Sequence, residues 1–235
     1  MRGLLALYLG ALAVALTTLG LSTSSLYRAR WVSSSTPTVV PVVLTTSYGL
    51  FQKCETSSYL PGVVECRPFP QRGRDCGRRE AELPKEGGAQ VLSGEDHDEE
   101  DERWGFCESW YTAGYAHQLS LVFALANLIA LVLTLVGTAT VGRGFRTEKL
   151  RSGWKLVAGL MTLQALCLVV SSSLIAYERN HDRRFAHGAH LGRSWTMTTV
   201  SYALNLAVVL ALLFVRATGR LRIVPGEDGY EPISA

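Results

Sequence analysis

The stretch Trp31–Cys66 reads WVSSSTPTVVPVVLTTSYGLFQKCETSSYLPGVVEC. Valine and threonine fill most of Thr38–Thr46, with Pro37 before this run and Pro41 within it. Runs of β-branched residues are typical of strands, and proline in a sheet is confined to edges and bulges. We therefore expect a small antiparallel β-sheet in this stretch.

Apolar segments lie on both sides of this stretch, and each is long enough to cross the hydrocarbon core as a helix, which takes about 20 residues. Their cores are Gly3–Leu21, Leu119–Val141, Lys155–Ala176 and Met197–Val215. The expected fold class is a membrane all-α four-helix bundle with a small extracellular antiparallel β-sheet. The expected organisation is a first span at 1–21, a long extracellular loop at 22–117, a second span at 118–141, a cytoplasmic loop at 142–154, a third span at 155–176, a second extracellular loop at 177–196, a fourth span at 197–215 and a cytoplasmic tail at 216–235.

The first apolar segment also has features of a cleaved signal peptide, because it stands at the N-terminus and Arg2 precedes it. Its apolar run is long for a signal peptide, and the sequence Leu21-Ser-Thr-Ser-Ser that follows contains no A-x-A cleavage site. We therefore favour a retained span over a cleaved signal.

The orientation of the spans follows from basic residues and cysteines. Four basic residues lie in the loop 142–154 and three in the tail, which indicates that both face the cytoplasm. The loop 177–196 also carries four arginines, which counts against this orientation. The cysteines of the loop 22–117 decide the question, because they can be oxidised only outside the cytosol. Both termini are then cytoplasmic.

Aromatic residues near the ends of the spans fit the same layout. Indole and phenol rings favour the headgroup level, since they combine an apolar face with a polar group. The residues concerned are Trp104, Trp110, Tyr111, Tyr115, Trp154 and Trp195.

Four of the five cysteines, Cys54, Cys66, Cys76 and Cys107, lie in the long polar loop, and Cys167 lies in the third span. An even set in an oxidising compartment indicates disulfides, for which four cysteines allow three connectivities. A tetrahedral zinc site is the alternative, but no pair has the short CxxC spacing that such sites use. We therefore expect disulfides and no metal.

The second half of the long loop is highly charged. Arg67–Arg79 is basic, and Glu95–Glu102 is almost entirely acidic. Like charges in a block repel one another and stay solvated, and the EF-hand spacing and glycine of a calcium site are missing, so we expect a solvated acidic tip. His181, His187 and His190 offer a second possible metal site, but neighbouring arginines would repel a cation.

Several function classes are excluded by composition. The net charge is only +3, and the sequence has no basic stripe or stacking motif, so nucleic acid is not an expected partner. No charged residue lies deep in any apolar segment, although a pump or ion-coupled transporter normally needs one. The serines have no recognisable catalytic base beside them and no phosphate-binding glycine loop occurs, so we expect neither an enzyme nor a cofactor.

Trp31, Gly49-Leu50-Phe51, Cys54 and Cys66 follow one another in the loop after a first span. This order resembles the W–GLW–C–C signature of the claudin, peripheral myelin protein and calcium-channel gamma-subunit superfamily. The resemblance covers the motif over Trp31–Cys66, and it covers the whole chain in topology. Phe51 stands where the family has tryptophan, and Cys76 and Cys107 are additional to the motif.

The resemblance implies roles for these residues. Cys54 and Cys66 would form a disulfide between neighbouring strands, closing a loop of about 13 residues and adding about 3 kcal/mol through chain entropy. Trp31, Gly49, Leu50 and Phe51 would wedge the sheet against the helix ends. Cys76 and Cys107 would then be left to pair with each other. The basic residue that claudins carry where the second span begins has no obvious counterpart near His117.

The function that the resemblance implies is a non-enzymatic, claudin-like protein of the plasma membrane. Its sheet would organise cell-surface contacts and adhesion. The alternative is an accessory, gamma-like subunit that modulates a channel or receptor. The expected partners are the lipid bilayer and either a second copy of the chain or other membrane proteins.

Overall fold

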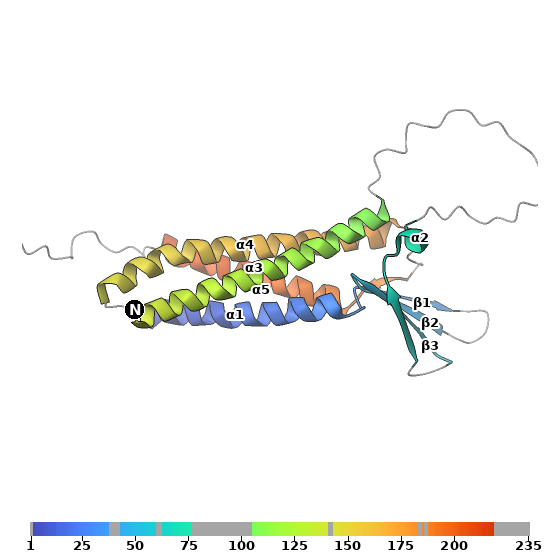
Figure 1. Cartoon of the computed structure of the whole chain (residues 1–235), viewed down its shortest axis with the longest axis horizontal. Helices are drawn as coiled ribbons and strands as arrows, with labels where there is room; N and C mark the ends of the chain where they lie inside the picture. The colour runs from blue at the N-terminus through green and yellow to red at the C-terminus, as the bar shows by residue number, and fades with distance from the viewer. Residues whose placement is uncertain are drawn as a thin grey trace, which may run out of the picture. The chain divides into compact units, whose positions relative to one another are not determined.

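The computed structural model describes residues 2–37, 43–59, 63–76, 105–140, 143–182, 185 and 188–218. The acidic run Glu95–Glu102, Trp104 and His187 lie outside the described residues. The elements follow in the order α1 (Arg2–Tyr27), β1 (Val32–Pro37), β2 (Val43–Tyr48), β3 (Gln52–Ser57), β4 (Val64–Pro68), α2 (Arg72–Asp75), α3 (Phe106–Thr140), α4 (Arg143–His181), β5 (His190–Leu191) and α5 (Arg193–Ala217) (Figure 1).

Four of the described helices, α1, α3, α4 and α5, are long and apolar enough to cross a membrane. Their apolar stretches are Leu5–Tyr27, Phe106–Val136, Gly153–His181 and Arg193–Ala217. The backbone hydrogen bonds of a helix are satisfied within the helix, which is the condition for crossing hydrocarbon. These lengths and compositions are those of a multi-pass membrane protein.

The helices extend well beyond the spans expected from hydropathy. α3 begins at Phe106, inside the region expected to be loop, and α4 begins at Arg143, inside the expected loop 142–154. α4 also continues to His181, and only 182–192 separate it from α5. The helices run past the expected spans because hydropathy detects only the part of a helix that is apolar enough for lipid. The span boundaries themselves stay a prediction.

The five strands form one antiparallel sheet in the order β4-β3-β2-β1-β5. Only the second half of Thr38–Thr46 is described as strand, within β2, because 38–42 lie outside the described residues. β1, which reads VSSSTP, was not expected to be a strand. Serine has little intrinsic preference for strands, but β1 lies between β2 and β5 and pairs with both, and this pairing makes it a strand.

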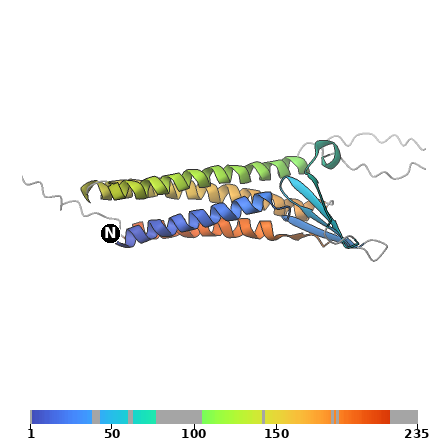
Figure 2. The same cartoon turned by 60° about the horizontal axis from the view of Figure 1, so that its bottom comes forward.

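The chain divides into two compact units. The bundle unit consists of Met1–Gly20, Ser120–Leu166 and Val200–Ala235, and the sheet unit consists of Leu21–Leu119 and Cys167–Thr199. Each long helix contributes one part to each unit. In the sheet unit, the strands lie beside the ends of α1 and α3 (Figure 2).

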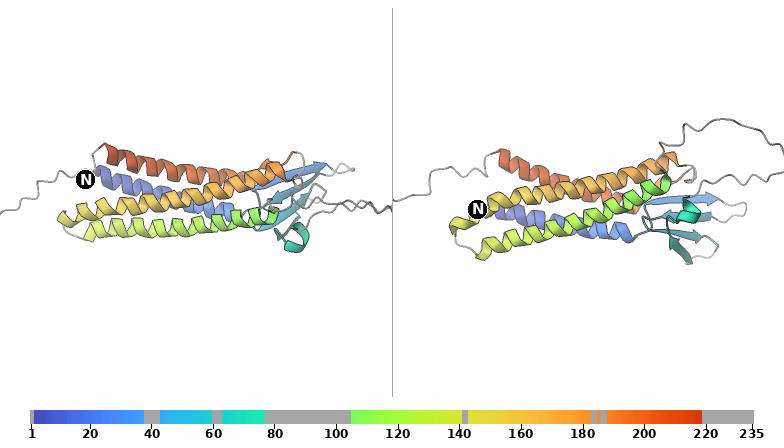
Figure 3. Two further views of the ribbon diagram at one scale, coloured as in Figure 1. Left: turned by 90° about the horizontal axis from the view of Figure 1, so that it is seen from above. Right: turned by 45° about the horizontal axis from the view of Figure 1, so that its top comes forward.

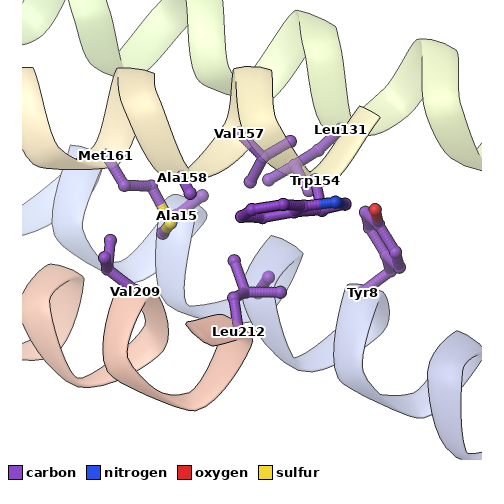
Figure 4. Close-up of a cluster of buried hydrophobic side chains, with 10 residues drawn as sticks. Tyr8, Ala15, Leu131, Trp154, Val157, Ala158, Met161, Val209 and Leu212 are labelled. Atoms are coloured by element: carbon purple, nitrogen blue, oxygen red, sulfur yellow. The ribbon is translucent and has the colours of Figure 1, made fainter. Parts of the chain in front are cut away.

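Within the bundle unit, segments of α1, α3, α4 and α5 pack side by side (Figure 3). Their core cluster consists of Tyr8, Ala11, Ala15, Leu131, Trp154, Val157, Ala158, Met161, Val209 and Leu212 (Figure 4). Trp154 is 8% exposed, and the Arg216 guanidinium lies 4.6 Å from its ring centroid. A cation over an aromatic face is attracted by the ring quadrupole.

Candidate functional site

The candidate site is the sheet together with the residues that fasten it to the helix ends, all within the sheet unit. Trp31 stands between the end of α1 and the start of β1 and is completely buried. Its indole Nε1 donates to the carbonyl of Ser25 at 2.8 Å, and its backbone N–H donates to the carbonyl of Tyr48 at 2.8 Å. Trp31 therefore ties the last turn of α1 to the first strand pair.

His117 of α3, which is not part of the motif, packs directly against Trp31. Their ring centroids are 5.4 Å apart with the planes at 87°. The His117 Nε2–H donates to the carbonyl of Ser22 at 3.0 Å, and Nε2 also lies 3.2 Å from the Ser25 hydroxyl. Thr198 of α5 donates to the same hydroxyl at 3.2 Å. Buried side chains of α1, α3 and α5 thus form one hydrogen-bonded network under Trp31.

Gly49 provides the close approach that the motif implies. A methyl group placed on its Cα would lie 2.8 Å from the Cα of Ala29 and 3.0 Å from the carbonyl oxygen of Gln52. The Gly49 carbonyl accepts a hydrogen bond of 3.2 Å from the indole of Trp110, which is fully buried on α3. No side chain fits in this contact, so glycine lets the strand end touch the residues after α1.

Leu50 and Phe51 complete the motif on the side of α3. Leu50 is 1% exposed, as expected for a wedge residue, whereas Phe51 keeps 39% of its surface exposed. The Phe51 ring lies over Gly114, because a methyl group there would be 3.2 Å from Phe51 Cε1. The motif residues therefore converge on the first turns of α3.

The four cysteines of the long loop form two pairs. Cys54 and Cys66 stand opposite each other on β3 and β4, with their sulfur atoms 2.05 Å apart. This is the strand-to-strand pairing that the resemblance implies. Cys76, which follows α2, pairs with Cys107 in the first turn of α3 at 1.98 Å. Cys167 is not in a disulfide.

An aromatic cluster, defined as Tyr48, Phe69, Phe106, Trp110 and Phe185, joins four separate parts of the sheet unit. Neighbouring rings have centroids 5.1 to 6.0 Å apart. Three of these pairs, Tyr48–Phe69, Tyr48–Phe185 and Phe69–Trp110, are edge-to-face, and such contacts add about 0.5–1.5 kcal/mol each to the burial of the rings. Trp110 is fully buried and contacts three of the other rings; its expected place at the membrane interface stays a prediction. The cluster connects β2, the segment after β4, α3 and the loop after α4.

The loop after α4 becomes part of the sheet. Leu191 and His190 of β5 pair with Val32 and Ser33 of β1. Of the histidines considered for a metal, His190 is exposed on this strand, and the His181 ring stacks on Tyr177 at 4.1 Å. The described residues contain no group of three or more side chains placed to hold a metal.

An ion pair holds the segment that leads from β4 to the second disulfide. Both Asp75 carboxylate oxygens accept hydrogen bonds of 2.7 Å from the Arg67 guanidinium, and Oδ2 also accepts 2.8 Å from the backbone N–H of Gln71. The hydrogen bonds from Arg67 are the main cause of the lowered pKa of Asp75, with that from Gln71 adding to it. The bonded carboxylate is favoured over the neutral acid.

This ion pair predicts an acid-sensitive contribution to stability. Because the pKa of Asp75 is lowered on folding, the contribution is present above the ordinary value of 3.8 and is lost as the pH falls through the lowered value. We expect Asp75→Asn to reduce stability at neutral pH by about 1–2 kcal/mol, since Arg67 is partly exposed. Thermal unfolding in detergent at successive pH values should show this difference shrinking below pH 3.8.

The control for this prediction removes the partner. In an Arg67→Met background, Asp75→Asn should cost much less, and the difference should lose most of its acid dependence. A difference between wild type and Asp75→Asn that stays constant from neutral to strongly acid pH would contradict the prediction.

A search of protein-family models and of curated protein sequences found no match to this chain.

Proposed function

We propose that this chain is a claudin-like integral membrane protein that organises contacts at the plasma membrane through its sheet, without enzymatic activity. The proposal rests on the difference between the two ends of the sheet. The end at Trp31 and Gly49 is buried and hydrogen-bonded to the helix ends. The opposite end exposes apolar side chains. A rigidly fastened sheet with an exposed apolar end is suited to contact other molecules.

We call this exposed end the apolar tip and define it as Val43, Tyr59, Val63 and Val64. These side chains are 44%, 77%, 50% and 56% exposed, respectively. Exposed apolar groups that gather at one place favour protein–protein contact. Val64 also lies on β4, which is last in the strand order, and an edge strand offers unpaired backbone groups to a second chain.

The membrane and its sidedness are part of the proposal. Leu133, Leu210 and Phe214 of the bundle unit are 66%, 65% and 68% exposed, which favours lipid around this unit. The paired cysteines favour an oxidising compartment for the sheet, and hence the outer face of the plasma membrane. With four spans, both termini then face the cytoplasm. The order of Trp31, Gly49-Leu50-Phe51, Cys54 and Cys66 supports kinship with claudins.

The occupant that we propose for the apolar tip is a second copy of the chain. To test this, fluorescently tagged protein is expressed in cells that are mixed with cells carrying a differently tagged copy. We expect both tags to be enriched where two expressing cells touch, and to be evenly spread where an expressing cell touches a non-expressing one. Val64→Lys should abolish the enrichment, because it places a charge in the apolar tip.

The matched control is Ser35→Lys. Ser35 is exposed and lies in the same row of the sheet as Val64, through Thr45 and Thr56, but three strands away. It should leave the enrichment unchanged. An even surface distribution of the wild-type protein would contradict the proposal. Copurification in mild detergent with one channel or receptor, whose membrane yield falls on deletion of this chain, would instead favour the accessory-subunit function.

A further inference from the structure

Three carboxamide side chains are buried inside the bundle unit, each on a different helix. Asn127 on α3 and Asn205 on α5 are 0% exposed, and Gln164 on α4 is 1% exposed. No charged residue occurs in 120–136, 156–166 or 200–215, the helix segments that carry them. The most polar groups within these segments are therefore neutral amides that face the interior of the bundle.

Each of the three amides lies beside the core cluster of the bundle unit. Each lies one helical turn from a member of that cluster and on the same face of its helix: Asn127 from Leu131, Gln164 from Met161, and Asn205 from Val209. α4 runs opposite to α3 and α5, so a step forward along α4 and a step back along the other two lead toward the same end. We call Asn127, Gln164 and Asn205 the amide layer.

The amide layer lacks the hydrogen bonds that buried amides require. In the part of the chain that the structure describes, neither Nδ2 nor Oδ1 of Asn127 and Asn205 meets a hydrogen-bond partner, and the same holds for Nε2 of Gln164. By contrast, the buried Thr18 hydroxyl of α1 donates to the carbonyl of Ala15 at 3.1 Å and is satisfied within its own helix. Burying an amide without a partner costs about 2–7 kcal/mol, so these groups call for a ligand.

The unmet donors and acceptors of the amide layer indicate which kind of ligand it could bind. Each asparagine presents a donor and an acceptor, both unmet. A cation would leave the NH₂ groups unmet, an anion would leave the carbonyl oxygens unmet, and no charged side chain is present to balance either. Water both donates and accepts, and buried water typically makes about three hydrogen bonds to groups of this kind. We propose that the amide layer binds water molecules inside the bundle.

Such water molecules would supply hydrogen bonds to the amides where the neighbouring core side chains are apolar. A water-mediated hydrogen bond is nearly as favourable in enthalpy as a direct one. The inference rests on the bundle unit alone and is independent of the contact function proposed for the sheet.

The sequence allows a direct test, because it contains only three asparagines: Asn127, Asn180 and Asn205. Asn180 is exposed near the end of α4 and serves as an internal control. The full chain is labelled with ¹⁵N-asparagine and studied by NMR in detergent micelles, with water protons as the probe. Asn180→Ser, an exposed substitution, identifies the control signal without changing the amide layer.

We expect the two remaining side-chain amides to show nuclear Overhauser contacts to water, with the ratio of laboratory-frame to rotating-frame effects that marks long-lived bound water. The Asn180 amide should show only contacts to rapidly exchanging water. Absence of the long-lived contact at either buried asparagine would overturn the proposal. A cross-peak joining the two buried amides directly, without water contacts, would also overturn it.

Discussion

Trp31→Ala should lower the stability of the folded chain by about 3–5 kcal/mol, the usual cost of removing a fully buried large aromatic side chain. Trp31 is 0% exposed, its indole donates to Ser25, and its ring packs edge-on against His117. The substitution leaves a cavity where α1, α3 and β1 meet. The expected result is a large drop in the thermal midpoint in detergent, with faster proteolysis of the loop 22–117.

Two further variants separate burial from hydrogen bonding. Trp31→Phe keeps most of the ring but loses the donor to Ser25, so it should cost about 1–3 kcal/mol. Phe51→Ala should cost less than Trp31→Ala, because Phe51 is already 39% exposed. If Trp31 were only an anchor at the lipid headgroups, removing it would change stability little in detergent, and that result would contradict the arrangement described here.

Much of the architecture could be predicted from the sequence because its signals are local. Long apolar runs identify the helices, and β-branched residues identify β2. The pairing of Cys54 with Cys66 was implied by the order of motif residues and not by any geometric argument. By contrast, β1 contains three serines in a row, and only its pairing with β2 and β5 makes it a strand.

The fastening of the sheet could not be predicted in full, because its partners are far apart in sequence. Phe185 and Tyr48 pack together although 136 residues lie between them. No feature of the sequence around Gly114 predicts that the Phe51 ring packs against it. His117 did carry a usable signal, since a lone histidine at the start of an apolar span needs a buried partner. Its partners Ser22, Ser25 and Trp31 lie about 90 residues earlier in the chain, so their identity could not be predicted from the neighbouring sequence.

Gly192→Ala should be the most damaging glycine-to-alanine substitution among the glycines that the structure describes. Gly192 lies between β5 and α5, and its N–H donates to the carbonyl of Trp31 at 2.7 Å. A methyl group on its Cα would lie 2.8 Å from the carbonyl carbon of Arg30 and closer still to the oxygen. Backbone atoms cannot move aside as a flexible side chain can, so we expect a cost of about 3 kcal/mol, at the upper end for overpacking.

Unfolding of Gly192→Ala should begin near the substitution, because other contacts depend on the close approach of Gly192 to Arg30. The Ser194 N–H donates to the carbonyl of Arg30 at 3.1 Å, so displacing Gly192 also separates the start of α5 from the segment before β1. Limited proteolysis should therefore cut the loop 177–196 first, while the Cys54–Cys66 disulfide stays formed. Gly105→Ala is the matched control, since a methyl group there would meet nothing within 4 Å. If the two alanine variants unfold at the same temperature, the close packing of β5 against the chain before β1 is wrong.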